Sequence, residues 1–484
     1  MGDAPIRFTD DDLARFAVAS RDVNPLHTDA SYARRTPFGE RVVYGALGGL
    51  AAMARLRPRA GRALAKLTLE FAGPIFVGVD YAVEVDDDGA DRAKVRVRDG
   101  RRVVLRATAR FRDGDPDDAS GDSGSHLAAA AARETSSLTE GLSVEGRYAA
   151  EPRALAEISG AYGLRARGVG RAQVEAVMAC SYVVGMELPG ESALFSDVTL
   201  DFVDGTRPPG PLAWSARVEA ARPELGVLSL RATLAGVASA KLTAFAREPL
   251  RAPAISGRRG DALKGKVALV TGASRGLGAS LARALCAEGC AVVGTYQHSR
   301  DEAEALGATL GADFVAMRGD AADPEWAARA REMVTRRFGG LDLLVCNACP
   351  PLRPLWLEPA SAARVEQHVT RAVAMVNTPM AHLLDLVAAR GGAAVVVSSA
   401  AVDEPPGEWP HYVAAKCAIE GLARVAAVEY PAARVAVLRP PKLLTQLVNT
   451  PMGRHGAEDP DAYAARVVRA LLARAPGAGL VLDA

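Results

Sequence analysis

The hydrophobic and polar residues of the N-terminal segment alternate along several short runs. These runs are Tyr81–Asp87 (YAVEVDD), Ala93–Asp99 (AKVRVRD) and Val103–Phe111 (VVLRATARF), and they follow an opening stretch with helical spacing. Alternation places one side of each run against a core and leaves the other side in water, which is typical of antiparallel strands. The pattern predicts an α+β domain over residues 1–113.

Residues 138–250 repeat this pattern. The run Leu67-Thr-Leu-Glu-Phe71 is echoed by Val198-Thr-Leu-Asp-Phe202, and Val43-Tyr-Gly45 is echoed by Val183-Val-Gly185. Because internal similarity indicates repeated structural units, we predict two copies of one fold, a helix wrapped by an antiparallel sheet. The copies are expected to pack side by side as a pseudo-dimer. The alternative is a chance likeness between two unrelated α+β domains.

The last segment, residues 264–484, alternates short apolar strands with helices. This alternation predicts a parallel sheet with helices on both faces. Two polar stretches separate the three segments: residues 114–137, rich in Asp, Ser, Gly and Ala, and residues 251–263. Their composition is typical of flexible linkers.

Composition and charge exclude several classes of partner. The 484 residues include 58 basic and 57 acidic side chains, for a net charge of +1, so nothing predicts binding to nucleic acid or an anionic membrane. The sequence contains no run of about 18 apolar residues, so it predicts no membrane span. The acidic N-terminus does not resemble a secretory signal. Cys346 and Cys349 have CxxC spacing without a second such pair. We interpret them as buried thiols in a cytoplasmic protein rather than as a metal site.

The sharpest local motif is Asp22-Val-Asn-Pro-Leu-His27. Pro25 stiffens the backbone and disfavours helix at Asn24, so Asp22 and His27 can address one small molecule across a turn. Such a pair can activate a water, or move protons off C2 and onto the C3 hydroxyl of a 3-hydroxyacyl thioester. The alternative is an Asx-turn at Asp22 with His27 on the surface.

The surrounding residues, SRDVNPLHTDASYA followed by RTPFGERVVYGAL, resemble the MaoC-like (R)-specific enoyl-CoA hydratase family of hot-dog folds. The resemblance implies that Asp22 and His27 are the catalytic pair and that Asn24 orients the turn. It also implies that Gly45 is the first residue of the central helix, where its N–H polarises the thioester carbonyl. This chain departs from the family pattern at Arg21, where Gly is usual, and at Tyr44, where His is usual.

The second repeat lacks the motif and reads SGAYGLRARGVGR at the corresponding place. We therefore predict one hydratase site in a double hot-dog, with the second half completing the fold and part of the acyl tunnel.

A glycine-rich loop, TGASRGLG, directly follows the apolar strand Lys266–Val270 and precedes a stretch with helical spacing. Gly272, Gly276 and Gly278 permit the tight turn, the approach of a pyrophosphate and close packing of helix on strand. The next strand ends at Tyr296 without the acidic residue usual for NAD. Arg275, Ser299 and Arg300 offer the basic and hydroxyl groups that bind a 2′-phosphate, so we predict NADPH as the cofactor. The residues predicted to bind it in and beyond the loop are Gly272, Ser274, Arg275, Gly276, Leu277, Gly278, Ser299 and Arg300.

Tyr412 and Lys416 are four residues apart and share one face of a predicted helix. A cation beside a phenol favours the phenolate, so we expect Lys416 to lower the pKa of Tyr412 and make it a usable acid and base. Ser399 lies thirteen residues before Tyr412, at the end of another predicted strand.

Together these elements resemble the short-chain dehydrogenase/reductase family, particularly 3-oxoacyl-carrier-protein reductases. The resemblance implies a Rossmann-type doubly wound parallel sheet, with Ser399 holding the substrate carbonyl, Tyr412 donating the proton and Lys416 binding the ribose. It also places Asp320 at the adenine and Asn347 and Ala348 at the cofactor. The chain departs from the family at Cys349 and Pro441, which stand where Gly is usual, and at Arg371, which stands near the position of the usual catalytic Asn.

The two sites suit consecutive steps on one substrate. The leading hypothesis is a bifunctional reductase–dehydratase that converts 3-oxoacyl thioesters of CoA or a carrier protein to trans-2-enoyl thioesters, in fatty-acid or polyketide biosynthesis. One alternative is degradative hydration followed by NADP-linked oxidation. Another is an acyl-binding or assembly module with one inactive domain. The family resemblance also implies a homo-oligomer.

Overall fold

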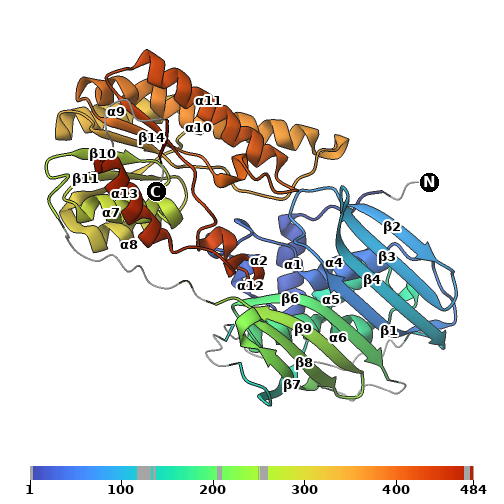
Figure 1. The fold of residues 1–484 in the computed structure, drawn as a ribbon. Coiled ribbons are helices and arrows are strands. Elements are labelled where there is room, and N and C mark those ends of the chain that lie inside the picture. Colours follow the sequence, from blue (N-terminus) through green and yellow to red (C-terminus); the bar gives the residue numbers. More distant parts are fainter. Residues whose placement is uncertain are drawn as a thin grey trace. The chain divides into compact units, whose positions relative to one another are not determined.

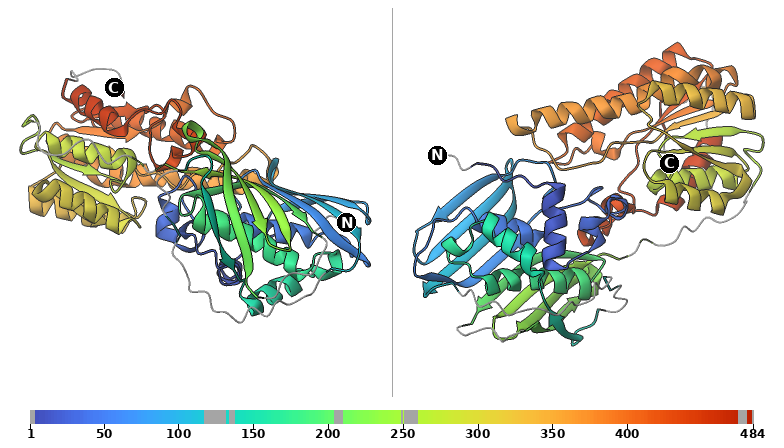
Figure 2. Two further views of the ribbon diagram at one scale, coloured as in Figure 1. Left: turned by 90° about the horizontal axis from the view of Figure 1, so that it is seen from below. Right: turned by 180° about the vertical axis from the view of Figure 1, so that it is seen from behind.

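The computed structural model describes residues 4–116, 132–133, 138–203, 210–248, 250, 260–473 and 480–482. The chain divides into two compact units (Figures 1 and 2). The first comprises Met1–Pro249 with Thr450–Met452, and the second comprises Leu250–Asn449 with Gly453–Ala484.

The first unit is built on one nine-stranded antiparallel sheet with the order β2-β3-β4-β1-β6-β9-β8-β7-β5. The alternating runs of the sequence become strands as expected; along β7, for example, buried and exposed residues alternate. The strands are β1 (Arg62–Phe71), β2 (Ala82–Asp87), β3 (Arg92–Asp99), β4 (Arg102–Asp113), β5 (Ser143–Tyr148), β6 (Ala193–Phe202), β7 (Leu212–Arg222), β8 (Val227–Leu234) and β9 (Ala238–Ala246).

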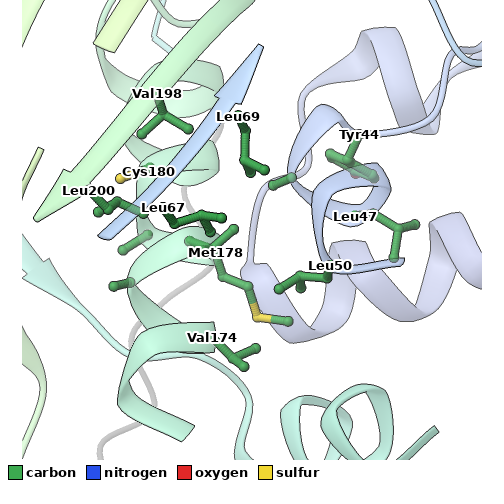
Figure 3. Packing of buried hydrophobic residues seen from close by; sticks show 14 of the residues in the cluster. Tyr44, Leu47, Leu50, Leu67, Leu69, Val174, Met178, Cys180, Val198 and Leu200 are labelled. Carbon is green, nitrogen blue, oxygen red and sulfur yellow. The ribbon is translucent and has the colours of Figure 1, made fainter. Parts of the chain in front are cut away.

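Six helices accompany this sheet in the described part of the first unit's main segment. The two central ones, α4 and α6, pack on β1, β3 and β4 and on β6 and β9, respectively. Figure 3 shows their apolar side chains meeting those of β1 and β6 in a single core. The helices are α1 (Asp10–Ser20), α2 (Pro25–Thr28), α3 (Ala30–Arg34), α4 (Gly45–Met53), α5 (Pro152–Ala161) and α6 (Arg171–Tyr182), and a π-helical turn, η2 (Val183–Glu187), follows α6.

The predicted repeat is confirmed at the middle of the sheet. The two similar runs, in β1 and β6, pair with each other in antiparallel register, with Leu67 opposite Leu200 and Leu69 opposite Val198. Thr68 faces Thr199, its equivalent in the repeat, and their hydroxyl oxygens lie 3.1 Å apart. A pseudo-twofold axis therefore passes through this pair, and the two halves form the side-by-side double hot-dog that the sequence predicted.

The second proposed echo is wrong. Gly45 begins α4, whereas Gly185 lies beyond the end of α6, in the π-helical turn. The three-residue similarity was too short to distinguish the two ends of a helix. The structural counterpart of the residues before Gly45 is the segment between α5 and α6. That segment spans only residues 162–170, against residues 21–44 between α1 and α4. The second half therefore lacks the loop that carries Asp22 and His27 in the first.

Most of the predicted linker at 114–137 lies outside the described residues, as does most of the one at 251–263. Within the first, Arg133 makes defined contacts: its N–H donates to the carbonyl of Met186 (2.9 Å), its carbonyl accepts from Glu191 (3.0 Å), and its guanidinium pairs with Glu187 (2.8 Å). At this residue the chain therefore packs against the second half of the sheet.

The second unit contains a seven-stranded parallel sheet of order β12-β11-β10-β13-β14-β15-β16, as predicted for a doubly wound fold. Its central strands are buried on both faces. The strands are β10 (Val267–Val270), β11 (Ala291–Tyr296), β12 (Phe314–Arg318), β13 (Leu343–Cys346), β14 (Ala393–Val397), β15 (Arg434–Leu438) and β16 (Val481–Leu482).

Alternate residues of β10 enter two separate cores. Ala268 and Val270 pack with α7 and α13, whereas Val267 and Leu269 pack with α9, α10 and α11 on the other face. The helices are α7 (Gly276–Ala287), α8 (Arg300–Leu310), α9 (Pro324–Phe338), α10 (Ala362–Ala389), α11 (Pro410–Glu429), α12 (Pro451–Arg454) and α13 (Pro460–Ala473).

Among the described residues, the segment Pro359–Ala389, which contains α10, is the one helix long and apolar enough to cross a membrane by length and composition. Half of its apolar window is buried inside the protein, and α10 packs on α9, α11, β13 and β14. A core helix has the same composition, so this finding is weak evidence for a membrane span.

Candidate active sites

The loop between α1 and α4 carries the first site. Asn24 begins α2, where its side-chain oxygen accepts from the N–H of Leu26 (3.0 Å). Its amide nitrogen donates to the carbonyls of Gly185 (2.8 Å) and Gly190 (3.2 Å). The predicted orientation of the turn by Asn24 thus has a structural basis: Asn24 ties the loop to the second half of the unit.

Asp22 is fully buried in this loop. Its carboxylate accepts from the N–H of Asn24 (3.1 Å) and from the hydroxyl of Ser181 on α6 (2.7 Å). Burial raises the pKa of Asp22 to about 6, although both hydrogen bonds lower it. The site residue Ser181 was missed in the sequence because it belongs to the second repeat, 159 positions away.

Gly185 also approaches Asp22 from the second repeat. A Cβ atom at Gly185 would lie 2.7 Å from a carboxylate oxygen of Asp22, closer than real Cβ atoms come to any neighbour. Glycine is therefore needed at this point of the π-helical turn for steric reasons. The second half contributes Ser181 and Gly185 to the pocket, beyond completing the fold.

His27 is fixed by Val42 and Tyr44. Its Nδ1 lies 2.8 Å from the carbonyl oxygen of Val42, which can only accept, so Nδ1 carries the hydrogen and Nε2 keeps a lone pair. Burial lowers the pKa of His27 to about 4 and keeps the ring neutral. The ring stacks on Tyr44 with centroids 3.9 Å apart, and the Tyr44 hydroxyl donates to the backbone carbonyl of Asp22 (2.7 Å).

The structure explains the two residues that depart from the expected motif, Tyr44 and Arg21. Tyr44 supports both His27 and the Asp22 backbone. Arg21 adopts a left-handed conformation, φ 55°, which explains why glycine suits this position. Its Nε donates to the carbonyl of Ala149 (2.7 Å), which offsets part of the strain.

Asp22 and His27 line one cavity of about 240 Å³. Gly45, the first residue of α4, also lines it, and the N-cap residue Tyr44 makes no side-chain hydrogen bond to the helix end. The cavity therefore meets the positive end of a helix dipole. Its other walls are mostly apolar and come from both halves, including Phe38, Phe71, Ile75, Val104, Val184, Leu194 and Phe195.

The second site begins at the loop after β10. Gly278 lies so close to the loop backbone that a Cβ there would be 2.1 Å from the carbonyl oxygen of Gly272. Arg275 is the N-cap of α7 and makes no side-chain cap hydrogen bond, and Ser274 and Leu277 flank it at the helix start. The loop therefore presents backbone amides at a helix N-terminus, as a pyrophosphate site requires.

Asn347 and Ala348 brace this loop from the end of β13. The Asn347 amide donates to the carbonyls of Gly272 (3.0 Å) and Thr271 (3.1 Å). The Thr271 hydroxyl accepts from the N–H groups of Asn347 (2.9 Å) and Ala348 (3.0 Å). The Asn347 side chain thus shapes the loop.

Ser299 and Arg300 begin α8, beyond the end of β11. Arg300 is exposed, and its Nε donates to Glu304 (2.6 Å). Asp320 accepts from Gln297 (3.0 Å) and pairs with Arg371. Burial raises the pKa of Asp320, but the hydrogen bonds from Arg371 and from the N–H of Ala322, together with the charge of Arg371, outweigh burial and hold that pKa below the ordinary value.

The structure brings Ser399, Tyr412 and Lys416 together, as predicted. Ser399 follows β14, and its hydroxyl hydrogen-bonds to Tyr412. Tyr412 and Lys416 lie on α11, with the Lys416 ammonium 5.4 Å from the centre of the Tyr412 ring. Lys416 is buried and donates to the carbonyl of Val397 (2.8 Å).

The expected lowering of the Tyr412 pKa is wrong for this structure. Burial raises the pKa of Tyr412 to about 12, and the neighbouring Cys349 raises it further. Lys416 is itself desolvated, which lowers its own pKa, and its ammonium is directed at Val397. The interpretation of both CxxC thiols as buried also fails, because Cys349 is exposed while Cys346 is buried.

Comparisons with known proteins agree with the two-part organisation. Residues 2–108 match the model of the MaoC like domain, and residues 266–455 match the model of the short chain dehydrogenase family. The cis-4-hydroxycyclohexanecarboxylate dehydrogenase of Sinomonas cyclohexanicum is 34% identical over 183 residues, which cover 37% of this chain and 72% of that protein.

Other similar proteins match over shorter stretches. Versicolorin reductase 1 of Aspergillus parasiticus is 46% identical over 89 residues, and the 3-oxoacyl-(acyl-carrier-protein) reductase of Escherichia coli is 41% identical over 85. Each of these alignments covers 18% of this chain and only 34% of the relative. A solved 3-ketoacyl-(acyl-carrier-protein) reductase of Brucella melitensis, complexed with NADH, is 26% identical, covers 45% of this chain and 96% of its own, and has a TM-score of 0.41.

The burial of Asp22 predicts a pH-dependent cost to folding. Its folded pKa, about 6, exceeds the ordinary 3.8, so the carboxyl favours the fold below about pH 4 and this contribution is lost as pH rises through 6. The loss is about 3 kcal/mol. Asp22→Asn keeps the shape of the side chain without its charge. We expect its free energy of unfolding to exceed that of wild type near pH 8 but not near pH 4. Urea unfolding at both pH values measures this difference.

Asp80→Asn serves as the control for this measurement, because the Asp80 side chain is 57% exposed. Its stability difference from wild type should change little with pH. Equal stabilities of wild type and Asp22→Asn near pH 8 would contradict the burial argument.

Proposed function

The chain belongs to the short-chain dehydrogenase family over residues 266–455 and carries a MaoC like domain over residues 2–108, and from this premise we propose that it is a bifunctional reductase–dehydratase. It reduces a 3-oxoacyl thioester with NADPH to the (R)-3-hydroxyacyl thioester and then eliminates water to give the trans-2-enoyl thioester. The similar E. coli protein is a 3-oxoacyl-(acyl-carrier-protein) reductase, which supports this substrate class.

One observation carries the proposal. Burial raises the pKa of Asp22 to about 6 and lowers that of His27 to about 4, which inverts the usual order of a carboxyl and an imidazole. In the window between these values the carboxyl holds its proton while the ring is neutral. The cavity thus contains one proton donor and one proton acceptor, as the elimination of water requires.

These protonation states allow elimination with Asp22 as the acid and His27 as the base. The amide end of α4 at Gly45 polarises the thioester carbonyl, which makes the C2 proton acidic. His27 Nε2 takes the C2 proton, the C2–C3 double bond forms, and the C3 hydroxyl leaves with the proton of Asp22 as water. Proton exchange with solvent then returns His27 and Asp22 to their starting states.

The residues of the second site fit a nicotinamide dinucleotide, which supplies the hydride for reduction when bound. The fit rests on the close approach of Gly278 to Gly272 and on the uncapped start of α7. Gly272 to Gly278 would hold the pyrophosphate, Asp320 would contact the adenine, and Lys416 would contact the ribose.

The state of Tyr412 supports reduction over the degradative alternative. With a pKa of about 12 the phenol is protonated at neutral pH. Tyr412 can therefore give its proton to the carbonyl oxygen, while Ser399 holds that oxygen by its hydroxyl. Oxidation of an alcohol would need the phenolate, which burial disfavours.

The second alternative, an acyl-binding or assembly module with one inactive domain, is motivated by Arg371 at the position of the usual Asn. It predicts that one of the two activities is absent, so separate assays of the two steps distinguish it from the bifunctional enzyme.

We extend the proposal to the partners and location of the enzyme. The acyl group would be carried by CoA or an acyl carrier protein, and the enzyme would act in the cytoplasm as a homo-oligomer. All six cysteines are free thiols, which suits a reducing compartment.

Single-site variants should separate the two steps. We expect Asp22→Asn to consume NADPH at the wild-type rate and to accumulate the 3-hydroxyacyl thioester. Tyr412→Phe should lose NADPH consumption by a factor of about 10²–10⁴ and still dehydrate supplied (R)-3-hydroxyacyl thioester. Mass spectrometry of a short 3-oxoacyl thioester panel incubated with NADPH measures both products. Each variant serves as the control for the other, and a wild type that consumes no NADPH with any of these substrates would sink the reductase assignment.

The dehydratase rate should follow a bell-shaped pH profile. Because Asp22 must be protonated and His27 neutral, kcat/KM should fall below about pH 4 and above about pH 6. The Ser181 hydrogen bond lowers the pKa of Asp22, so Ser181→Ala should move the alkaline limb to higher pH. Enoyl thioester absorbance gives the rates. A flat profile, or a limb that stays in place in Ser181→Ala, would contradict these proton assignments.

The cofactor preference rests on the charges around the end of β11. Residues 297–300 include no carboxylate, and Arg275 and Arg300 supply positive charge for a 2′-phosphate. We expect kcat/KM for NADPH to exceed that for NADH by at least about tenfold, the effect of about 1.4 kcal/mol. Arg275→Ala should raise KM for NADPH alone, whereas Arg318→Ala, on the exposed part of β12, should not. A clear NADH preference of the wild type would reverse the assignment.

A further inference from the structure

The position of the family's usual Asn on α10 carries no Asn in this chain. Arg371, which occupies that position, pairs with Asp320. Its guanidinium cannot be deprotonated in a protein, so it cannot exchange protons with Lys416. Proton supply to Lys416 would therefore come from water or from another side chain.

Such a group lies one helical turn earlier. His368 faces α11, where its ring meets that of His411 edge to face, with centroids 4.4 Å apart. His368 lies where α10 packs on α11, the helix that carries Lys416, and the charge of Lys416 adds to burial in lowering the pKa of His368. Helix α10 therefore presents an imidazole to the helix that carries Lys416, at a position other than the one that the family pattern specifies.

The nitrogens of these two rings lack partners among the described residues. Nε2 of His368 and both ring nitrogens of His411 are buried without a hydrogen bond, and His411 is only 1% exposed. Buried polar atoms are normally paired with protein or ordered water. Three unpaired imidazole nitrogens lie together where α10 packs on α11, and such a cluster can take up water and exchange protons with it.

Both imidazoles are held in the neutral form. Burial, together with Lys416, lowers the pKa of His368 to about 4. Burial, followed by His368 and Arg364, lowers that of His411 to about 4 as well. A neutral imidazole has one N–H and one lone pair, so it can pass a proton on from one nitrogen while it receives another at the second.

We propose that His368 is the positioning residue that returns protons to Lys416 in the reductase site, in place of the family's Asn, and that His411 extends this path. The inference rests on the proposed reductase function. The groups around this path are Lys416, Tyr412 and His411 on α11, Arg364 on α10, and Cys349 after β13.

The protons balance in each turnover. Reduction of the carbonyl takes one proton from Tyr412, and Lys416 restores it and is left as the neutral amine. An N–H bond of His368 then breaks as one forms on Lys416, and the other ring nitrogen of His368 takes a proton from water directly or through His411. The net change is one solvent proton consumed and a new tautomer of His368, which solvent exchange reverses.

Replacement of His368 should impair turnover without impairing binding. We expect His368→Ala to lower the kcat of ketone reduction by about 10- to 100-fold, within the range of lost acid–base assistance, with little change in KM for NADPH or the thioester. Added imidazole should recover part of the rate, and His368→Asn, which restores a carboxamide beside Lys416, should retain more activity than His368→Ala. The matched control is His382→Ala, on the same helix.

Measurements of kcat, melting temperature and recovery by imidazole separate this role from a structural one. A loss of kcat that tracks a fall in melting temperature and is not recovered by imidazole would overturn the proposal. Wild-type kcat in His368→Ala would overturn it as well. A wild type that consumes no NADPH would refute the proposed reductase function, and the role of His368 with it. A wild type that consumes NADPH, with an unaffected His368→Ala variant, would refute the role of His368 alone. Independently, the His368 pKa, measured by NMR, should rise in Lys416→Met, and an unchanged value would show that the two groups do not communicate.

Discussion

The pairing of β1 with β6 is the interaction on which the dehydratase half of this protein depends. It joins two sheets into one and places the pseudo-twofold axis at Thr68 and Thr199. This pairing, together with the packing of α6 on α1 and α4, brings α6 of the second repeat against the loop that carries Asp22. The Ser181 hydrogen bond and the close approach of Gly185 follow from it. The second repeat has only a short segment between α5 and α6, but its helix α6 is part of the site in the first repeat.

Burial sets the proton chemistry of both sites more strongly than neighbouring charge does. It raises the pKa values of Asp22 and Tyr412 and lowers those of His27 and Lys416, and in each case burial is the largest cause. All four shifts favour the neutral form of the group. Neutral side chains suit the largely apolar cavity at Asp22 and His27, because a buried charge there would cost more free energy.

The second unit keeps most of the expected short-chain dehydrogenase site, but the residue at one position of that site has a different partner. The glycine loop, the Asn347 brace and the Ser399, Tyr412 and Lys416 cluster occupy the expected ends of parallel strands and one helix. Arg371, on the helix that should complete the cluster, instead joins Asp320. The imidazoles of His368 and His411 meet where α10 packs on α11, the helix that carries Lys416.

The sequence by itself determined the elements and their order, because alternation, glycine placement and the spacing of Tyr412 and Lys416 are local properties of the chain. It also identified the similar runs of β1 and β6, and thus the double sheet. It missed Ser181, Tyr44 and His368 as neighbours of the reacting groups, and it assigned the wrong direction to the Tyr412 pKa. These features were decided by tertiary structure alone, since desolvation and contacts between distant segments exist only after the helices pack on their sheets.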